Sequence, residues 1–269
     1  MLDGQDFGHR HHGRIVIVFG LATVLTLGVA CNRQTIPEVQ SGGDTEVAEV
    51  VSENSDQPEK KVLRHAVFFK FKDASTEEQV KEVVDAFRKL PAQIDEIADF
   101  EWGTNNSPED HDDEYTHCFL LTFHNEAGRE AYLPHDAHTG EFADTLRPHL
   151  EKVFVIDYWG DASEQPAKQA LRHAVFFKFK EDAAEADIKK VEEAFAALPT
   201  KIDSIKAFEW GKNNSPENHD QGFTHCFMVT FDSEEGRAAY LPHPEHAAFV
   251  QVLLPVLDQV RVLDYWAEK

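Results

Sequence analysis

The chain has 269 residues, of which 49 are acidic and 26 are basic, so its formal net charge is −23 at pH 7. This charge argues against nucleic acid or an anionic membrane surface as a direct partner, because both would repel the chain. The length accommodates one large domain or two small ones, and neutral, apolar and cationic ligands remain open.

The first 31 residues have the order of an export signal. Arg10 and Arg14 precede an uncharged apolar run over residues 15–29, and small residues then lead into Cys31. The segment resembles a bacterial lipoprotein signal that ends at Cys31, although Leu27 stands four residues before the cysteine where three is usual. We favour lipidation of Cys31 over an uncleaved membrane anchor or ordinary secretion. All three alternatives place the mature protein outside the cytoplasm, on the periplasmic side of a membrane.

Residues 32–61 are rich in Glu, Asp, Ser, Gln and Gly, and none of them is aromatic. A segment of this composition cannot bury enough apolar surface to fold by itself. We therefore expect a disordered acidic tether that holds the folded part of the protein away from the membrane.

The decapeptide LRHAVFFKFK begins at residue 63 and again at residue 171. Downstream residues recur with the same offset of 108, so that Trp102 matches Trp210. A period of this length indicates two copies of a complete domain rather than a solenoid. We expect domains at residues 62–160 and 171–269, joined by a polar linker at residues 161–170.

Each copy has the pattern β-α-β-β-α-β. Alternation in the opening strand places His65, Val67 and Phe69 on one face and Ala66 and Phe68 on the other. Both faces of this strand are therefore apolar, and each must be covered.

The offset between the copies falls to 107 near their ends, which places a one-residue deletion shortly after the second histidine of the HxxH segment, in an expected loop.

A helix is expected over residues 76–90, with Ser75 and Glu78 spaced as a capping box and one apolar stripe. The remaining elements are two strands, two helices and a last strand, at residues 100–103, 116–123, 126–133, 139–150 and 153–159. Helices can cover only one face of each sheet in this α+β fold. The two remaining apolar faces can bury each other, which closes a barrel-like pseudo-dimer inside the single chain.

Four polar positions in each repeat are candidate site residues: His65, His117, Tyr132 and His138, with His173, His225, Tyr240 and His246 as their counterparts. The strand histidines share faces with apolar residues, so we expect them to point into the interior between the two sheets. Burial there favours neutral imidazole, which suits a general base. The alternative is an ordinary core histidine with satisfied hydrogen bonds.

Other side chains receive structural interpretations. Cys118 and Cys226 lie in apolar strands and are expected to be buried thiols, although a disulfide is possible if their strands adjoin. Trp102 and Trp210 are expected to fill the core or a pocket wall. The chain has no CxxC or HExxH motif, so we expect neither a dedicated metal site nor a cofactor.

Several motifs together resemble the stress-responsive A/B barrel family of dimeric alpha-beta barrel proteins. They are the opening HxVFFKFK strand, the TH strand, the AYLPHDAH and AYLPHPEH segments and the closing DYW strand. The resemblance covers residues 63–159 and 171–266. It implies ferredoxin-like α+β repeats and dimers whose sheets close a barrel, a condition that two repeats can meet within one chain.

The resemblance also implies site residues, because one plant cyclase of this family condenses a linear polyketide. It assigns catalysis to Tyr132 and His138, and to Tyr240 and His246 in the second repeat. It places the four strand histidines, His65, His117, His173 and His225, in the pocket walls. In such a pair, imidazole takes a proton beside a carbonyl while the phenol donates to the oxygen.

The two repeats differ after the first histidine of this segment, where the family usually has proline. The first repeat has Asp136 and the second keeps Pro244, so Tyr240 and His246 form the better-preserved pair. The leading hypothesis is a protein that binds a small apolar or carbonyl-containing molecule in barrel pockets. The alternatives are a cyclase or lyase that uses Tyr and His for acid-base catalysis, and a structural barrel without a ligand.

Overall fold

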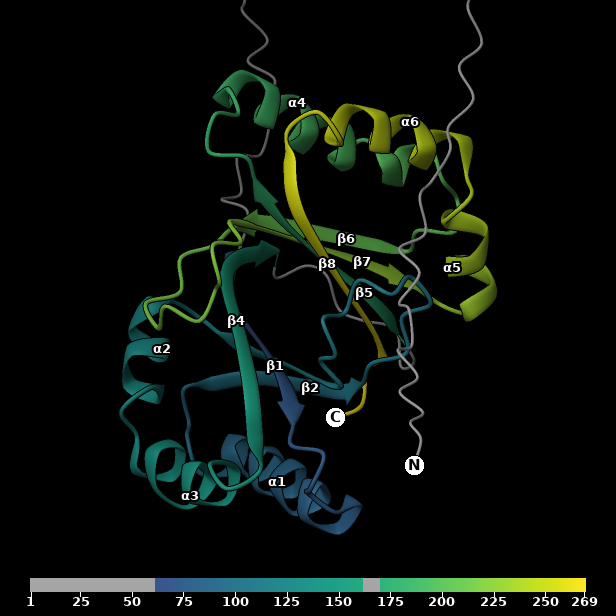
Figure 1. The fold of residues 1–269 in the computed structure, drawn as a ribbon. Helices are drawn as coiled ribbons and strands as arrows, with labels where there is room; N and C mark the ends of the chain where they lie inside the picture. Colours follow the sequence, from purple (N-terminus) through teal and green to yellow (C-terminus); the bar gives the residue numbers. More distant parts are fainter. Residues whose placement is uncertain (1–60, 162–169) are drawn as a thin grey trace, which may run out of the picture. The chain divides into compact units, whose positions relative to one another are not determined.

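The computed structural model describes residues 61–161 and 170–269, which all belong to one compact unit of the chain. They form two repeats, each with one antiparallel sheet and its helices on one face (Figure 1). The predicted export signal, Cys31 and nearly all of the tether and linker lie outside the described residues. Within the described ranges, no helix combines the length and apolar character needed to span a membrane.

The elements of the first repeat are β1 (Lys61–Phe71), α1 (Glu77–Lys89), η1 (Leu90–Ala92), β2 (Ile97–Thr104), β3 (His117–Phe123), α2 (Glu126–Tyr132), η2 (His138–Phe142), α3 (Ala143–Leu146) and β4 (Leu150–Asp161). Those of the second are β5 (Leu171–Phe179), α4 (Glu185–Ala196), η3 (Leu198–Thr200), β6 (Ala207–Lys212), β7 (His225–Phe231), α5 (Glu234–Tyr240), α6 (Pro244–Leu253) and β8 (Leu257–Trp266). The strand orders are β2-β3-β1-β4 and β6-β7-β5-β8. This order confirms the two predicted ferredoxin-like α+β repeats.

The first helix begins one residue later than the predicted capping box required. Thr76, not Ser75, is the N-cap: its side chain accepts a hydrogen bond from the Gln79 backbone at 3.3 Å, and the Gln79 side chain accepts from Thr76 N at 2.9 Å. The glutamine at this position completes the box as well as a glutamate would. The apolar stripe of α1, with Val83 and Phe87, is buried as predicted.

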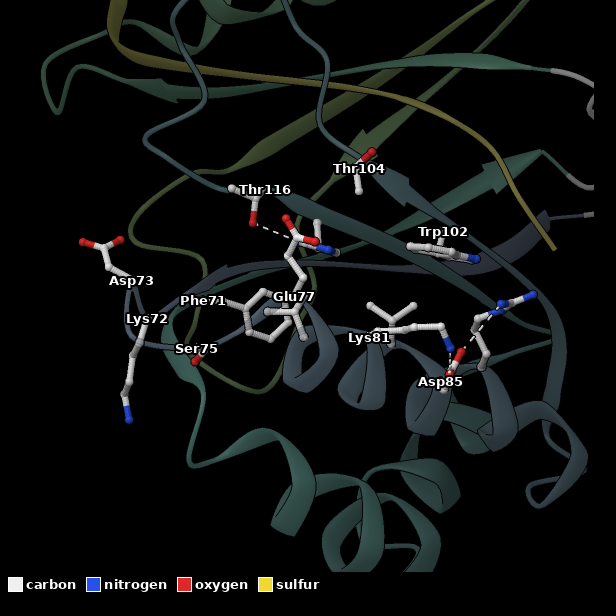
Figure 2. A pocket seen from close by; sticks show the side chains of 14 residues that line it. Phe71, Lys72, Asp73, Ser75, Glu77, Lys81, Asp85, Trp102, Thr104 and Thr116 are labelled. Atoms are coloured by element: carbon white, nitrogen blue, oxygen red, sulfur yellow. Dashed lines mark hydrogen bonds and ion pairs between the residues drawn. The ribbon is translucent and has the colours of Figure 1, made fainter.

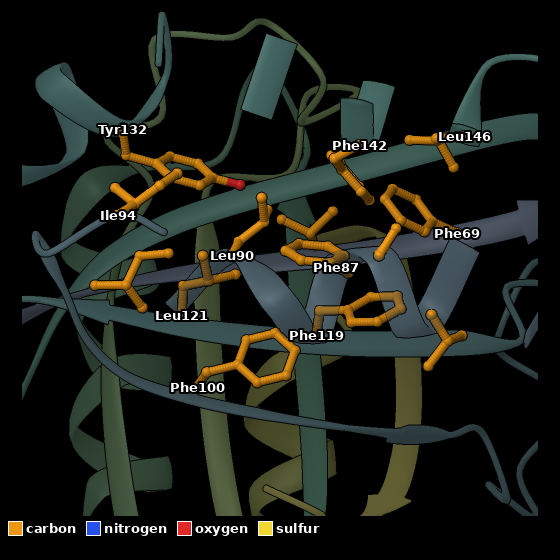
Figure 3. Packing of buried hydrophobic residues seen from close by; sticks show 14 of the residues in the cluster. Phe69, Phe87, Leu90, Ile94, Phe100, Phe119, Leu121, Tyr132, Phe142 and Leu146 are labelled. Atoms are coloured by element: carbon orange, nitrogen blue, oxygen red, sulfur yellow. The ribbon is translucent and has the colours of Figure 1, made fainter. Parts of the chain in front are cut away.

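The helices cover the strand face that carries His65, Val67 and Phe69, so the prediction that the strand histidines point between the sheets is wrong. Figure 3 shows Phe69, Phe87 and Phe119 packed together in this helix-side cluster. The rings of Phe87 and Phe119 lie 4.4 Å apart. Both faces of β1 are apolar, so alternation alone could not decide which face takes the helices.

The opposite faces of the two sheets bury each other, as predicted for an intrachain pair. Phe68 packs against Phe176 with ring centroids 5.1 Å apart, and Phe154 packs against Phe176 at 5.0 Å. Cys118 and Cys226 are buried free thiols in this cluster between the sheets. The second apolar face of each repeat is therefore used for pairing.

The expected closed barrel does not form as one continuous hydrogen-bonded sheet. The strands make two separate sheets, joined by an isolated antiparallel bridge between Trp102 and Glu268. The sheet edges nevertheless come very close. A Cβ atom on Gly103 would lie 2.5 Å from the Trp266 carbonyl oxygen, and one on Gly211 would lie 2.8 Å from Tyr158 Cβ. Glycine after each repeated tryptophan is therefore required by the approach of the other repeat.

The one-residue difference between the repeats lies in a helix, not in the predicted loop. Residues His138–Phe142 form a π-helix, whereas the second repeat has the regular helix α6. Phe142 packs on Phe87 at 4.6 Å, and Phe249, 107 positions further along the chain, packs on Phe195 at 4.5 Å. The wider π turn absorbs the additional residue and keeps the phenylalanine in the core.

Candidate functional site

Three of the four candidate side chains in each repeat lie together on the helix side of the sheet. Tyr132 ends α2, and its ring lies 4.3 Å from the ring of His138 at the start of η2. His65 on β1 approaches the same tyrosine edge-on at 5.7 Å. The second repeat repeats this arrangement, with Tyr240 at 4.4 Å from His246 and 5.6 Å from His173.

The hydrogen bond of His138 fixes its tautomer. Its Nδ1 lies 3.0 Å from the Leu133 carbonyl oxygen, which can only accept, so Nδ1 carries the proton. Burial lowers the pKa of His138 below the ordinary histidine value, which favours the neutral ring. His246 has the same arrangement with Leu241 O at 2.9 Å, and burial likewise lowers its pKa. In both repeats Nε2 therefore has a lone pair that can accept a proton.

His65 has the opposite electrostatics, so the prediction of a neutral ring is wrong for this position. Its Nδ1 lies 2.6 Å from Asp157 Oδ1. Burial by itself lowers the pKa of His65, but the Asp157 carboxylate outweighs burial and raises the pKa above its ordinary value. His173 and Asp264, 2.7 Å apart, repeat this pair, and the pKa of His173 is raised for the same reason.

Asp157 belongs to a buried chain of charges that sequence reasoning missed. Arg129 Nη1 donates to Asp157 Oδ2 at 2.8 Å and to the backbone and side-chain oxygens of Asn214 at 3.0 Å. Asn214 belongs to the other repeat. The aspartate of the DYW segment recurs in both copies, and this recurrence is the sequence signal that could have pointed to the network. In the structure, this aspartate lies opposite the strand histidine in both repeats.

The buried phenols complete the polar end of each pocket. Burial raises the pKa of Tyr132 well above the ordinary tyrosine value, and it also raises the pKa of Tyr240. Each phenol therefore keeps its proton near neutral pH and can donate it in a hydrogen bond. Each pocket thus combines an imidazole acceptor and a phenol donor with a histidine whose pKa is raised by a buried carboxylate.

The cavities beside these groups are small and apolar. Their volumes are about 160 Å³ in the first repeat and 270 Å³ in the second. The apolar walls of the first are Val67, Phe69, Phe87, Phe142, Leu146, Leu150, Val153 and Val155, and the second has an equivalent wall. Two further lining residues come from the opposite repeat: Glu217 and His219 in the first pocket, and Glu109 and His111 in the second.

His117 and Trp102 do not reach this pocket. They line a separate groove of about 580 Å³ between α1 and the strands β2 and β3 (Figure 2). Burial lowers the pKa of His117 to about 4. In the second repeat, Glu192 lies 3.0 Å from His225, and Val84 occupies the corresponding place in α1. The predicted pairing of the two strand histidines in one pocket wall is therefore wrong in the first repeat, where His65 lines the pocket and His117 lines the groove.

The described residues contain no group of three or more His, Cys, Asp or Glu side chains that could hold a metal ion. His135 and His138 are close in sequence, but His138 Nδ1 is hydrogen-bonded to the Leu133 carbonyl oxygen. His111 and His219 lie in different pockets.

Two paired ferredoxin-like repeats, each with a Tyr-His pocket beneath its helices, define a tandem A/B barrel protein. The sequence model described as Stress responsive A/B Barrel Domain matches residues 63–160 and 171–267. The chain therefore belongs to this family, in a tandem form.

Two of the sequence relatives each match about one repeat. The stress-response A/B barrel domain-containing protein HS1 of Arabidopsis thaliana is 40% identical over 101 residues, which cover 38% of this chain and 93% of that protein. Olivetolic acid cyclase of Cannabis sativa is 31% identical over 100 residues, covering 37% of this chain and 99% of the cyclase. The solved structure of an anthrone oxidase-like protein aligns over 79% of this chain and 93% of its own, with a TM-score of 0.56 and 11% identity. That similarity shows the fold alone.

Proposed function

We propose that the protein binds a small, largely apolar carbonyl compound in each of its two pockets. The observation that carries this proposal is the polar end of the cavity, where His138, Tyr132 and His65 lie against one another. A phenol donates to a carbonyl oxygen, and so does an imidazole whose two ring nitrogens are both protonated, while the apolar body of the ligand contacts the phenylalanine and leucine walls. Both cavities are smaller than the roughly 300–1,000 Å³ of drug-sized sites, so the ligand is compact.

A catalytic role in cyclase or lyase chemistry is the second candidate function. Its support is the fixed Nε2 lone pair of His138 and His246, next to a phenol. Nε2 takes a proton from the carbon beside the carbonyl, and the phenol donates a hydrogen bond to the oxygen that gains charge. The 31% identity to olivetolic acid cyclase is consistent with this chemistry. The second pocket, which is larger and has Pro244 at the start of α6, is the favoured site.

Acetophenone tests both candidates in one NMR titration of the full chain in D₂O. The ring signals of His138 and His246 report the two pockets separately. We expect saturable shifts of both, with acetophenone bound about tenfold more tightly than ethylbenzene, which lacks the carbonyl acceptor. With the ring signals of His65 and His173 as reporters of the two pockets in these variants, His138→Ala should abolish binding in the first pocket only, and His246→Ala in the second only.

The methyl protons of the bound ketone distinguish an enzyme from a binding protein. Loss of their signal by exchange with deuterium, faster than in buffer and slowed in the His246→Ala variant, would support catalysis. Binding without faster exchange would support a binding protein that does not catalyse this exchange. If neither compound shifts either histidine, the protein is a structural barrel and the proposal is wrong.

We further propose that the protein is exported and held at a membrane by a lipid on Cys31. The order of basic, apolar and small residues before Cys31 supports this location. In a bacterial host fed radiolabelled palmitate, the wild-type chain should become labelled and sediment with membranes. Cys31→Ser should lose the label and become soluble, whereas Cys118→Ser, which alters a buried thiol, should not. An unlabelled wild-type protein that still sediments would favour an uncleaved anchor instead.

A further inference from the structure

Each pocket contains a carboxylate from the opposite repeat that no contact in its own repeat explains. Glu217, in the loop of residues 213–224 between β6 and β7, reaches the pocket of the first repeat, where its Oε2 lies 3.8 Å from His65 Nε2. Glu109 does the same in the second pocket, 3.8 Å from His173 Nδ1. Both Oε2 atoms are buried, and neither has a hydrogen-bond partner among the described residues.

The loop that carries each glutamate, residues 213–224 for Glu217 and residues 105–116 for Glu109, is anchored on either side of it. Asn214 N donates to the Asp157 carbonyl oxygen at 2.9 Å, and Val155 N donates to the His219 carbonyl oxygen at 3.3 Å. Glu217 lies between these two attachment points on β4. In the second pocket, Asn106 and His111 make the equivalent bonds to β8, at 2.8 and 3.0 Å. The carboxylates are therefore held in place by backbone contacts that do not involve their own side chains.

An unpaired oxygen of this kind is unfavourable for folding. A buried polar atom without a partner costs free energy, and the cost is greatest for a charged group. His65 Nδ1 already bonds to Asp157 at 2.6 Å, and at 3.8 Å Glu217 Oε2 is too far from His65 Nε2 to accept a hydrogen bond from it. The recurrence of the same unsatisfied atom in both pockets indicates a role toward a molecule inside them.

We propose that Glu217 and Glu109 bind a hydroxyl group of the ligand, each in the pocket of the other repeat. This inference rests on the proposed binding of a carbonyl compound and narrows its class. The carboxylate lies only 3.8 Å from the histidine that donates to the carbonyl, so a hydroxyl on the carbon next to the carbonyl can reach it. The ligand is therefore an α-hydroxy ketone or α-hydroxy aldehyde with an apolar body, and each site requires both repeats.

Three phenyl ketones of similar size test the inference on the full chain. α-Hydroxyacetophenone offers the hydroxyl donor, acetophenone lacks it, and α-methoxyacetophenone has the oxygen but no donor. We expect the hydroxy compound to bind wild type at least about tenfold more tightly than the other two, as a hydrogen bond to a charged group predicts. Ring signals of His138 and His246 assign each dissociation constant to a pocket.

Substitution of a glutamate in one repeat should then change ligand binding in the pocket of the other repeat. Glu217→Leu should abolish the preference for the hydroxyl in the pocket that His138 reports and leave it intact in the pocket that His246 reports. Glu109→Leu should do the reverse. If a leucine variant fails to fold, Glu217→Gln keeps the size and removes the charge, and it should still reduce the preference severalfold.

Two failures can be told apart. If all three ketones bind wild type equally, or if Glu217→Leu leaves the preference unchanged, the carbonyl-binding function stands and this inference is wrong. If none of the ketones binds either pocket, the proposed function fails and the inference fails with it.

Discussion

Replacing Asp157 by asparagine is expected to lower the free energy of unfolding by about 3–5 kcal/mol. The carboxylate is fully buried and lies 2.6 Å from His65 Nδ1 and 2.8 Å from Arg129 Nη1. Asparagine carries no charge, so the arginine would stay buried without its counter-ion, which is the costly way to break a buried ion pair. Denaturant unfolding of wild type and variant at fixed pH measures the loss.

The same substitution should have a defined pH dependence. Although burial lowers the pKa of His65, Asp157 raises it above the unfolded value of about 6.5. A raised folded-state pKa stabilises the fold below the unfolded pKa, and this contribution disappears as pH rises through the folded pKa. The difference in stability between wild type and Asp157→Asn should therefore be larger near about pH 6 than near about pH 9. The part of the stability loss that comes from Arg129 should be present at both pH values.

The second repeat supplies a matched variant. Asp264 is also fully buried, with His173 and Arg237 each at 2.7 Å, so Asp264→Asn should cost a similar amount. Asp144→Asn removes an exposed partner of Arg147 and should cost no more than about 0.5 kcal/mol. A loss below about 1 kcal/mol for Asp157→Asn, with an unchanged His65 titration by NMR, would contradict the assignment.

Replacing Glu209 by leucine should cost about 3–5 kcal/mol and loosen the pairing of the two repeats. Glu209 on β6 accepts from Arg64 Nε at 3.0 Å and from Arg64 Nη2 at 3.1 Å, across the repeat interface. Tyr158 also donates to it, at 2.8 Å. Arg64 is only 7% exposed, so loss of the carboxylate leaves its charge buried. Equilibrium unfolding gives the loss, and hydrogen exchange along β1 and β6 shows whether the interface opens.

A double-mutant cycle separates the ion pair from the lost packing. Arg64→Met together with Glu209→Leu should recover most of the stability lost by Glu209→Leu, because two apolar side chains can replace a buried ion pair. The exposed Lys81–Asp85 pair on α1 is the control, and Asp85→Asn should cost at most about 0.5 kcal/mol. Additive losses in the cycle would show that the charges of Arg64 and Glu209 do not stabilise the interface.

The sequence by itself determined the duplication, the β-α-β-β-α-β order and the two apolar faces of the opening strand. These are properties of spacing along the chain, so they can be read from it directly. The grouping of Tyr132 with His138 could also be anticipated, because they are only six positions apart, on either side of a helix end. The pairing of the repeats followed from the second apolar face of each sheet, and the family resemblance implied the same pairing.

The tertiary structure decided which face of each sheet takes the helices, because both faces of β1 are equally apolar. It also decided the direction of the His65 pKa shift, because Asp157 is 92 positions away and becomes the neighbour of His65 only through strand pairing. The same holds for Glu217, which reaches the pocket of the other repeat because the loop after β6 packs on β4. Contacts between such distant positions depend on how the elements pack, and no local pattern in the chain encodes them.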